Sequence, residues 1–443
     1  MDKQTQEEIQ RVFKLQKAHQ RKMRATTAEE RKAKLNRFLE VIQAHEEEII
    51  EAIQQDVRKP HKEVQSAEIA GTVNSIKDNI EHLDEWMAPK EVASSLNSEA
   101  HGQLIYEPKG VCLVLGPWNY PFMLTMVPLA AAISAGNTAI VKLSDMTENT
   151  EKMAAKIIRE AFDEKEVASF EGDVDVATEL LEQPFDHIFF TGSTRVGKIV
   201  MTAAAKHLAS VTLELGGKSP TIIDDGYDLI DAAKKIGIGK FANAGQTCIA
   251  PDYLFIKEDQ QEAFANALQS VVQSGFSSDG VLDKNKFTQI VNERNFNRIK
   301  ALYDDAISKG AEAIFGGEFD KEDRTVHPTV LKNVTPDMKI MQEEIFAPIL
   351  PMLNYDQLDD VIDYITERDK PLATYIFSSN QNVIDKVLNY TTSGGAAVND
   401  VLVQFRELNL PFGGVNTSGI GSYHGVYGFK AFSHEKAVYH QAN

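Results

Sequence analysis

Short apolar runs that alternate with helical segments limit the fold of this chain more than any other feature of its sequence. From Gly110 onward, runs of this kind occupy residues 111–115, 138–143, 167–170 and 187–191. A strand, a helix and a further parallel strand in succession build a sheet with helices on both faces. The pattern predicts an α/β fold whose first sheet is Rossmann-like, the architecture that binds nucleotides at the carboxyl edge of its strands.

The same alternation begins again at residue 211. The later apolar runs occupy residues 211–215, 220–223, 253–256, 313–315, 348–353 and 372–377. Because 443 residues exceed the size of one ordinary hydrophobic core, a second domain is expected. The sequence therefore predicts two parallel-sheet α/β domains.

The segment before residue 82 has helical periodicity. Thr27 and Glu30 have the spacing of a capping box before the apolar residues 35, 38, 39 and 42. Residues 93–106 alternate in character and resemble an excursion from either core.

Residues 111–141 contain no charged side chain, which raises the question of a membrane span. Glycine, proline and asparagine residues interrupt the stretch, so we expect a buried strand, a loop, a helix and another strand. Neither end of the chain has the apolar segment of a secretion signal or anchor, which predicts a protein of the cytoplasm without a membrane anchor. The net charge of -19 argues against a nucleic-acid partner.

The chain has only two cysteines. Cys112 lies inside an apolar run and is expected in the core, whereas Cys248 follows Glu214 by thirty-four residues in a different setting. An isolated cysteine is most often structural. A thiol near a carboxylate, however, can form acyl intermediates that the carboxylate helps water to release. The histidines show no metal-ligand spacing, so no metal is expected.

Five segments decide between these interpretations. They occur in the order 116–121 (GPWNYP), 189–198 (FFTGSTRVGK), 213–220 (LELGGKSP), 241–248 (FANAGQTC) and 343–348 (EEIFAP). With them, the chain resembles the aldehyde dehydrogenase superfamily from about residue 25 to 435. The segments 398–401 (VNDV) and 411–425 (PFGGVNTSGIGSYHG) narrow the resemblance to the class 3 branch.

The resemblance implies a division of the chain into three parts. Residues 1–82 and 106–210 would form an NAD(P)-binding domain, and 211–393 a catalytic domain. A small β oligomerisation arm and a carboxyl-terminal segment would comprise 83–105 and 394–443. A homodimer is the expectation for class 3.

The resemblance also assigns the chemistry. Cys248 would attack the carbonyl of an aldehyde, and the side-chain amide of Asn119 with the backbone amide of Cys248 would bind the oxyanion. Glu214 would activate the water that hydrolyses the thioester, and the cofactor would take the hydride.

The cofactor residues lie at ends of predicted strands. A strand that ends in glycine and opens a helix aims backbone amides at a pyrophosphate, and a lysine and an acid follow the strand at 138–143. The cofactor-binding residues implied by the resemblance are Lys142, Ser144, Asp145, Gly192, Ser193, Val196, Gly197, Leu215, Gly216, Glu344 and Phe346.

The sequence departs from the family at the ribose position, where proline more often stands at Leu143 and glutamate at Asp145. An acid repels a 2'-phosphate and a lysine attracts one, so NAD is favoured and NADP tolerated.

Tyr120, Thr247, Ile249 and Phe412 flank the motifs and are predicted to line the substrate tunnel. Their character suits a medium- to long-chain aliphatic or an aromatic aldehyde. His424 is expected in a surface turn.

Three alternatives remain. The first is a coenzyme A-acylating or specialised semialdehyde dehydrogenase, although acylating relatives commonly lack a glutamate at position 214. The second is a non-catalytic protein on the same fold, which would be expected to have lost Cys248, Asn119 or Glu214. The third is a thiol esterase, which would not need the cofactor motifs.

Overall fold

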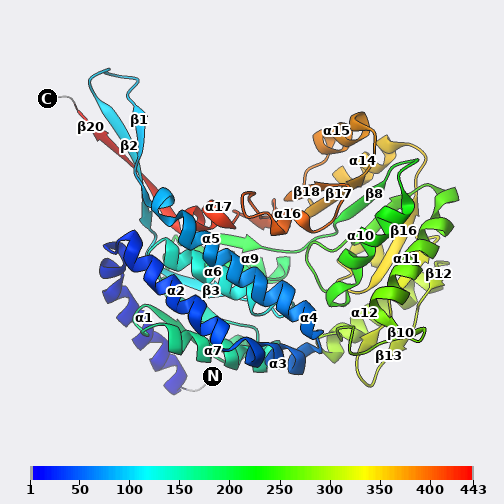
Figure 1. Ribbon diagram of the computed structural model, residues 1–443, viewed down its shortest axis with the longest axis horizontal. Coiled ribbons are helices and arrows are strands. Elements are labelled where there is room, and N and C mark those ends of the chain that lie inside the picture. The colour runs from blue at the N-terminus through cyan, green and yellow to red at the C-terminus, as the bar shows by residue number, and fades with distance from the viewer. Residues whose placement is uncertain (1–2, 442–443) are drawn as a thin grey trace.

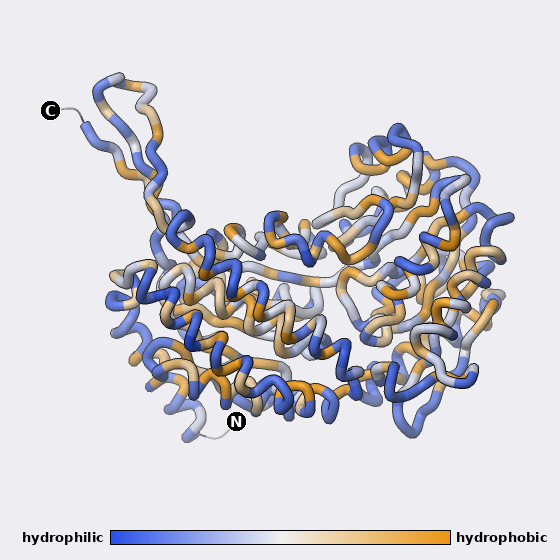
Figure 2. Tube along the Cα trace, viewed as in Figure 1, coloured by the Kyte–Doolittle hydropathy of each residue, from blue (hydrophilic) through white to orange (hydrophobic). Residues whose placement is uncertain are grey.

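The computed structural model describes residues 3–441 and contains two sheet-centred lobes and a projecting arm (Figure 1). The first lobe is built on a six-stranded sheet and the second on a seven-stranded sheet. The apolar segments gather inside each lobe, while the arm alternates between apolar and polar residues (Figure 2).

The first sheet has the strand order β19-β7-β6-β3-β4-β5. Its strands are β3 (Val111–Leu115), β4 (Thr138–Lys142), β5 (Val167–Ser169), β6 (His187–Thr191), β7 (Ser210–Glu214) and β19 (Gly419–Ile420). All neighbouring pairs are parallel except β19 with β7. The four apolar runs predicted between residues 111 and 191 are thus confirmed as strands of one sheet.

Helices cover both faces of this sheet, as the alternation predicted. They are α1 (Lys3–Arg24), α2 (Ala28–Ala44), α3 (Glu46–Val57), α5 (Ala70–Met87), α6 (Met123–Ser134), α7 (Glu148–Ala161), α8 (Val174–Leu181) and α9 (Thr194–Ala205). Strand β3 sends Leu113 into the cluster with α1, α8 and α9, and Cys112 and Val114 into the cluster with α2, α5, α6 and α7. The predicted core position of Cys112 is confirmed.

Two local predictions for this lobe are confirmed. The capping box of α2 is present, because Glu30 N donates to Thr27 Oγ1 (3.2 Å) and Thr27 N donates to Glu30 Oε2 (2.8 Å). The charge-free stretch forms β3, a loop, the fully buried helix α6 and β4. Among residues 3–441, no helix is long and apolar enough to span a bilayer.

The second sheet has the order β12-β15-β16-β9-β8-β17-β18. Its strands are β8 (Pro220–Ile223), β9 (Tyr253–Ile256), β12 (Glu312–Phe315), β15 (Thr329–Lys332), β16 (Ile349–Asn354), β17 (Ala373–Phe377) and β18 (Gly395–Val398). Only β12 runs antiparallel to its neighbour. The helices of this lobe are α10 (Leu229–Phe241), α11 (Gln261–Phe276), α12 (Glu293–Ser308), α13 (Lys339–Gln342), α14 (Leu358–Thr366) and α15 (Gln381–Tyr390).

Short elements join the larger ones. They are α4 (His61–Glu63), η1 (Val64–Ile69), η2 (Asp145–Thr147), η3 (Ala242–Gly245), η4 (Glu258–Gln260), β10 (Ser277–Ser278), β11 (Val281–Leu282), β13 (Phe319–Asp320), β14 (Thr325–Val326), α16 (Val403–Arg406) and α17 (Gly425–Ala431).

The border between the sheets differs from the predicted one. The run at 211–215 forms β7, which pairs with β6 in the first sheet, so placing the start of the second domain at residue 211 was wrong. Helix α9 is the crossover that brings β7 beside β6, and a run of apolar residues cannot reveal which sheet it joins. The change of sheet falls between β7 and β8.

The arm is a three-stranded antiparallel sheet of β1 (Lys90–Ala93), β2 (His101–Pro108) and β20 (Ser433–His440). The bounds expected for the arm and the carboxyl-terminal segment, 83–105 and 394–443, differ from those of this sheet, because α5 extends to Met87, β2 extends to Pro108, β18 joins the second sheet and β19 joins the first. The segment before β20 thus adds one edge strand to each main sheet before it enters the arm.

Candidate active site

Cys248 follows a strained turn. In η3, Asn243 and Ala244 have φ values of 50° and 52°, and Gly245 has a φ of 70°. A Cβ atom on Gly245 would lie 2.3 Å from the carbonyl oxygen of Ala347. Strain of this kind persists only when the surroundings enforce it, and it presents the cysteine in one fixed position.

The thiol of Cys248 faces a cavity of about 360 Å³. Burial raises the pKa of this thiol above its usual value, and the charges of Glu344 and Glu214 raise it further. The backbone amides of Cys248 and Ile249 act in the opposite direction. The resting nucleophile is therefore a neutral thiol that must lose its proton before it can attack.

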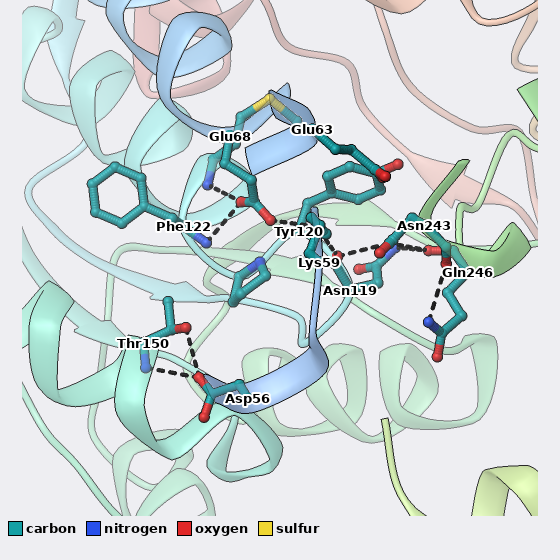
Figure 3. A network of polar contacts seen from close by, with 12 residues as sticks. Asp56, Lys59, Glu63, Glu68, Asn119, Tyr120, Phe122, Thr150, Asn243 and Gln246 are labelled. Atoms are coloured by element: carbon teal, nitrogen blue, oxygen red, sulfur yellow. Dashed lines mark hydrogen bonds and ion pairs between the residues drawn. The ribbon is translucent and has the colours of Figure 1, made fainter. Parts of the chain in front are cut away.

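Asn119 lies in the loop between β3 and α6 and is buried. Its Nδ2 donates to the carbonyl oxygen of Gln246 (3.0 Å), two residues before Cys248. Its own carbonyl oxygen accepts from Lys59 Nζ (2.8 Å) and Asn243 Nδ2 (2.9 Å) (Figure 3). An amide group has two hydrogens, so one remains to bind an oxyanion after the bond to Gln246 has fixed the rotamer.

Glu214 ends strand β7, opposite Gly419 of β19. Its side chain is buried, and neither carboxylate oxygen has a hydrogen-bond partner among the described residues. Burial raises its pKa well above the usual value. Its charge is one of the causes that raise the pKa of Cys248. A buried, unpartnered carboxyl with a raised pKa is suited to take a proton from water near neutral pH.

The turn from β6 into α9 has the predicted form. Ser193 is the N-cap of α9, and its Oγ accepts from Val196 N (3.4 Å). Gly192 follows β6 directly, and a Cβ on Gly197 would lie 2.7 Å from Leu215 Cδ2. Small residues therefore let the helix approach the sheet closely, and its N-terminus points out of the carboxyl edge.

Lys142 and Asp145, the residues expected at the adenosine ribose, do not bond to each other. Lys142 is buried and donates to Glu151 Oε1 (2.6 Å) and to the carbonyl oxygen of Leu143. Asp145 is exposed, and Ser144 caps η2 by accepting from Met146 N (3.3 Å). Sequence reasoning missed Glu151, although its place in the first turn of α7, nine residues after Lys142, was the available signal.

Gly216, Glu344 and Phe346 lie together beyond β7. A Cβ on Gly216 would lie 2.3 Å from Glu344 Oε2, so the carboxylate lies directly against this glycine. Burial raises the pKa of Glu344 to about 8. Phe346 has a φ of 53°, and its ring meets the ring of Trp118 edge-on at 5.4 Å.

These groups fit a dinucleotide. The carboxyl ends of β4, β6 and β7 contribute Lys142, the N-terminus of α9 and Gly216. Amides at a helix N-terminus suit a pyrophosphate, and a lysine with an acid suits a ribose. Within residues 3–441, no group of three or more His, Cys, Asp or Glu side chains is arranged to hold a metal ion.

The cavity at Cys248 is lined mainly by apolar side chains. Tyr120, Thr247 and Ile249 line it as predicted. Phe412 does not, and its ring instead stacks at 5.5 Å on His424, which does line the cavity. Placing His424 in a surface turn was wrong, because it is 4% exposed and burial lowers its pKa to about 3.

The cavity also contains residues that sequence reasoning missed. They come from η1, α5, α6 and the segment around α16, and include Ser66, Asn74, Met123, Leu124, Val127, Leu402, Phe405, Arg406 and Tyr423. For the three residues of α6 in this set, the signal in the sequence was the charge-free stretch that forms this helix.

The sequence matches the family profile described as "Aldehyde dehydrogenase family" over residues 1–438. It is 71% identical, over the full length of both chains, to AldX of Bacillus subtilis (strain 168), a protein assigned as an aldehyde dehydrogenase. It is 44% identical to aldehyde dehydrogenase family 3 member A2 of Mus musculus, with 89% of this chain and 81% of the relative covered. It is 41% identical to 4,4'-diaponeurosporen-aldehyde dehydrogenase of Staphylococcus aureus, with 92% and 88% covered.

Solved structures have the same fold. The substrate-bound AldH of Staphylococcus aureus superposes with a TM-score of 0.94 at 39% identity, over 98% of this chain and 94% of that chain. The NAD+ complex of an aldehyde dehydrogenase from Bacillus cereus superposes with a TM-score of 0.89 at 28% identity, over 98% of this chain and 89% of that chain.

Proposed function

Since the chain belongs to the aldehyde dehydrogenase family and to its class 3-like branch, we propose that Cys248, Asn119 and Glu214 perform the steps of that family's reaction. The protein is an NAD(P)-dependent enzyme that oxidises aliphatic or aromatic aldehydes to carboxylic acids. The observation that carries the assignment is that two distant segments meet beside the thiol: the side-chain amide of Asn119 bonds to the carbonyl oxygen of Gln246, two residues before Cys248.

In the first half of the reaction, the deprotonated sulfur of Cys248 adds to the aldehyde carbonyl and forms a thiohemiacetal. The free hydrogen of the Asn119 amide and the backbone amide of Cys248 stabilise the new oxyanion. One such donor contributes on the order of 3 kcal/mol to transition-state binding. Bound NAD(P) would supply the acceptor for the hydride. Loss of that hydride from the thiohemiacetal carbon would give a thioester on Cys248.

In the second half, Glu214 removes a proton from the water that attacks the thioester. The carboxylic acid leaves, and the Cys248 sulfur is restored. The absence of a hydrogen-bond partner for Glu214 among residues 3–441 leaves its oxygens available to that water. This arrangement supports hydrolysis rather than transfer of the acyl group to coenzyme A.

The dinucleotide is assigned to the edge formed by β4, β6 and β7. Ser193 and the N-terminus of α9 would bind the pyrophosphate, and Lys142 with Asp145 would face the adenosine ribose. Glu344 and Phe346 would hold the ribose of the nicotinamide. We propose a preference for NAD, because Glu151 already neutralises the lysine that would otherwise attract a 2'-phosphate.

The substrate is assigned to the cavity at Cys248. A volume of about 360 Å³ and an apolar lining fit a medium-chain or aromatic aldehyde, with longer chains extending toward solvent. The names of the relatives, which include a 4,4'-diaponeurosporen-aldehyde dehydrogenase and a coniferyl aldehyde dehydrogenase, support an apolar substrate.

Assembly and location complete the proposal. The arm offers a surface for a second copy, so we assign a homodimer. A reactive thiol at Cys248 is preserved in a reducing compartment, which supports the cytoplasm.

Stopped-flow measurement of reduced nicotinamide tests the assignment. Cys248→Ala should abolish turnover, while Cys112→Ala, the matched change at the other cysteine, should retain it. Glu214→Gln should give one burst of reduced nicotinamide, close in amount to the enzyme, followed by slow turnover. Acylation of Cys248 survives in this variant, whereas hydrolysis of the thioester does not. Parental steady-state turnover in Glu214→Gln would refute the role of Glu214. A coenzyme A thioester in place of free acid would establish the acylating alternative.

A further inference from the structure

A buried ion pair outside the substrate cavity contacts the middle and the carboxyl end of the loop that carries Asn119. Lys59, between α3 and α4, and Glu68, in η1, are both 0% exposed, and their charged groups lie 2.6 Å apart (Figure 3). Their surroundings show what the pair holds in place.

Lys59 binds the middle of the loop. Its Nζ donates to the carbonyl oxygen of Asn119 (2.8 Å) and to Glu68 Oε1 (2.6 Å). It also lies 4.0 Å from the ring centre of Tyr120, the residue that follows Asn119 and lines the cavity. The ammonium group thus has a partner for each of its donor directions.

Glu68 binds the end of the loop. Its Oε2 accepts from the backbone N–H groups of Phe122 (3.2 Å) and Met123 (3.0 Å), where α6 begins. A carboxylate at a helix N-terminus satisfies amides that lack partners within the helix. The ion pair therefore fixes the loop at Asn119 and at the start of α6.

Stability alone does not explain this pair. Taking two charges out of water costs several kcal/mol each, and apolar residues of similar volume often stabilise a protein equally well or better. Full burial with every partner satisfied is instead what a positioned active-site donor needs from its surroundings, since small misplacements reduce rates strongly.

We propose that Lys59 and Glu68 are positioning residues for Asn119. By holding its carbonyl oxygen, with Asn243 as the second donor, they aim its side-chain amide at the oxyanion that forms on Cys248. This inference rests on the proposed role of Asn119 and adds two residues to the machinery of the same site.

The test measures reactions that differ in their need for an oxyanion site. Aldehyde oxidation and hydrolysis of 4-nitrophenyl acetate both pass through an oxyanion at Cys248, whereas alkylation of Cys248 by iodoacetamide does not. In Lys59→Met, kcat for both reactions should fall about 10- to 100-fold while KM changes little, because misplacement of one donor acts on the transition state. The alkylation rate should stay unchanged.

A double variant separates positioning from folding. Lys59→Met with Glu68→Met removes both charges of the pair, so it should regain thermal stability relative to Lys59→Met while kcat stays low. Recovery of kcat together with stability would overturn the proposal. Arg58→Met is the matched control: Arg58 bonds to Asp323 and Thr325 rather than to the loop, so its loss should lower stability without lowering kcat.

Measurements in the Asn119→Ala background separate the positioning role of Lys59 from the role of Asn119 itself. If Lys59 acts through Asn119, Lys59→Met should cause no further loss of kcat in Asn119→Ala. An additional loss of the same size would overturn the positioning role and leave the role of Asn119 intact. Full activity of Asn119→Ala by itself would refute the proposed function at this residue, and the inference with it.

Discussion

Two acidic residues illustrate how burial sets chemistry at the scale of single side chains. Glu214 is buried without a partner among the described residues, and its pKa is raised well above the usual value. Glu151 is also buried, and burial raises its pKa while the bonded ammonium of Lys142 lowers it. The first is therefore available for proton transfer, whereas the second neutralises a neighbouring charge.

Glu214 should make stability depend on pH. Its pKa is higher in the folded than in the unfolded state, so its contribution is retained at low pH and lost as the pH rises through the folded value. We expect Glu214→Gln to raise the melting temperature at about pH 8.5 and to have little effect at about pH 5. Thermal denaturation at both pH values checks this, with Glu214→Asp retaining the pH dependence. The same change in melting temperature for Glu214→Gln at both pH values would contradict the prediction.

Glu151 should govern cofactor preference. Glu151→Gln leaves the charge of Lys142 uncompensated, so the ratio of kcat/KM for NADP to that for NAD should rise about tenfold, since one nearby charge is worth on the order of 1 kcal/mol or more. Glu148→Gln, in the same turn of α7 but paired with Lys152, is the control and should leave the ratio unchanged. The same ratio in Glu151→Gln as in the parent enzyme would show that Lys142 does not face the ribose.

At the scale of elements, the turn before Cys248 depends on one glycine. Gly245 combines a left-handed φ of 70° with contact to the backbone at Ala347, so no side chain fits there. The turn thereby packs against Ala347, the residue that follows Phe346.

Gly245→Ala should destabilise the fold by at least about 1–2 kcal/mol from the backbone conformation alone. The clash with Ala347 should add to this and displace Cys248, with a large loss of kcat. Gly226→Ala is the matched control, because Gly226 has a φ of 78° and nothing within 4 Å of its added Cβ. Chemical denaturation and kinetics would contradict the prediction if the two variants behaved alike.

At the scale of the whole molecule, the arm is the feature that neither lobe requires. Val92 and Tyr439 lie opposite Gly102 from its two sides, so they share one face of the three-stranded sheet. They are 45% and 49% exposed. Exposed apolar side chains around a glycine suit contact with a second copy of the chain.

Val92→Asp with Tyr439→Asp should shift the proposed dimer toward monomer, because association would bury two charges. Analytical ultracentrifugation over a range of concentrations measures this. Leu208→Asp, an apolar-to-acid change at a residue 93% exposed and outside the arm, should have no effect. A parent chain that sediments as a monomer of 49.2 kDa would refute the dimer itself.

The sequence by itself determined the local features. The apolar runs predicted ten of the strands in the two main sheets, the capping box located the start of α2, and the glycine-containing segment at 189–198 predicted the β6–α9 turn. These features depend on backbone conformations and contacts between near neighbours, which local residue types decide.

Only the tertiary structure decided which distant groups meet. It placed β7 in the first sheet, paired Lys142 with Glu151, buried His424 in the wall of the cavity and brought Lys59 to the carbonyl oxygen of Asn119, sixty residues away in the chain. Sheet membership and buried ion pairs result from packing between whole elements. Their free energies arise from desolvation and close contact, which no local pattern of residues encodes.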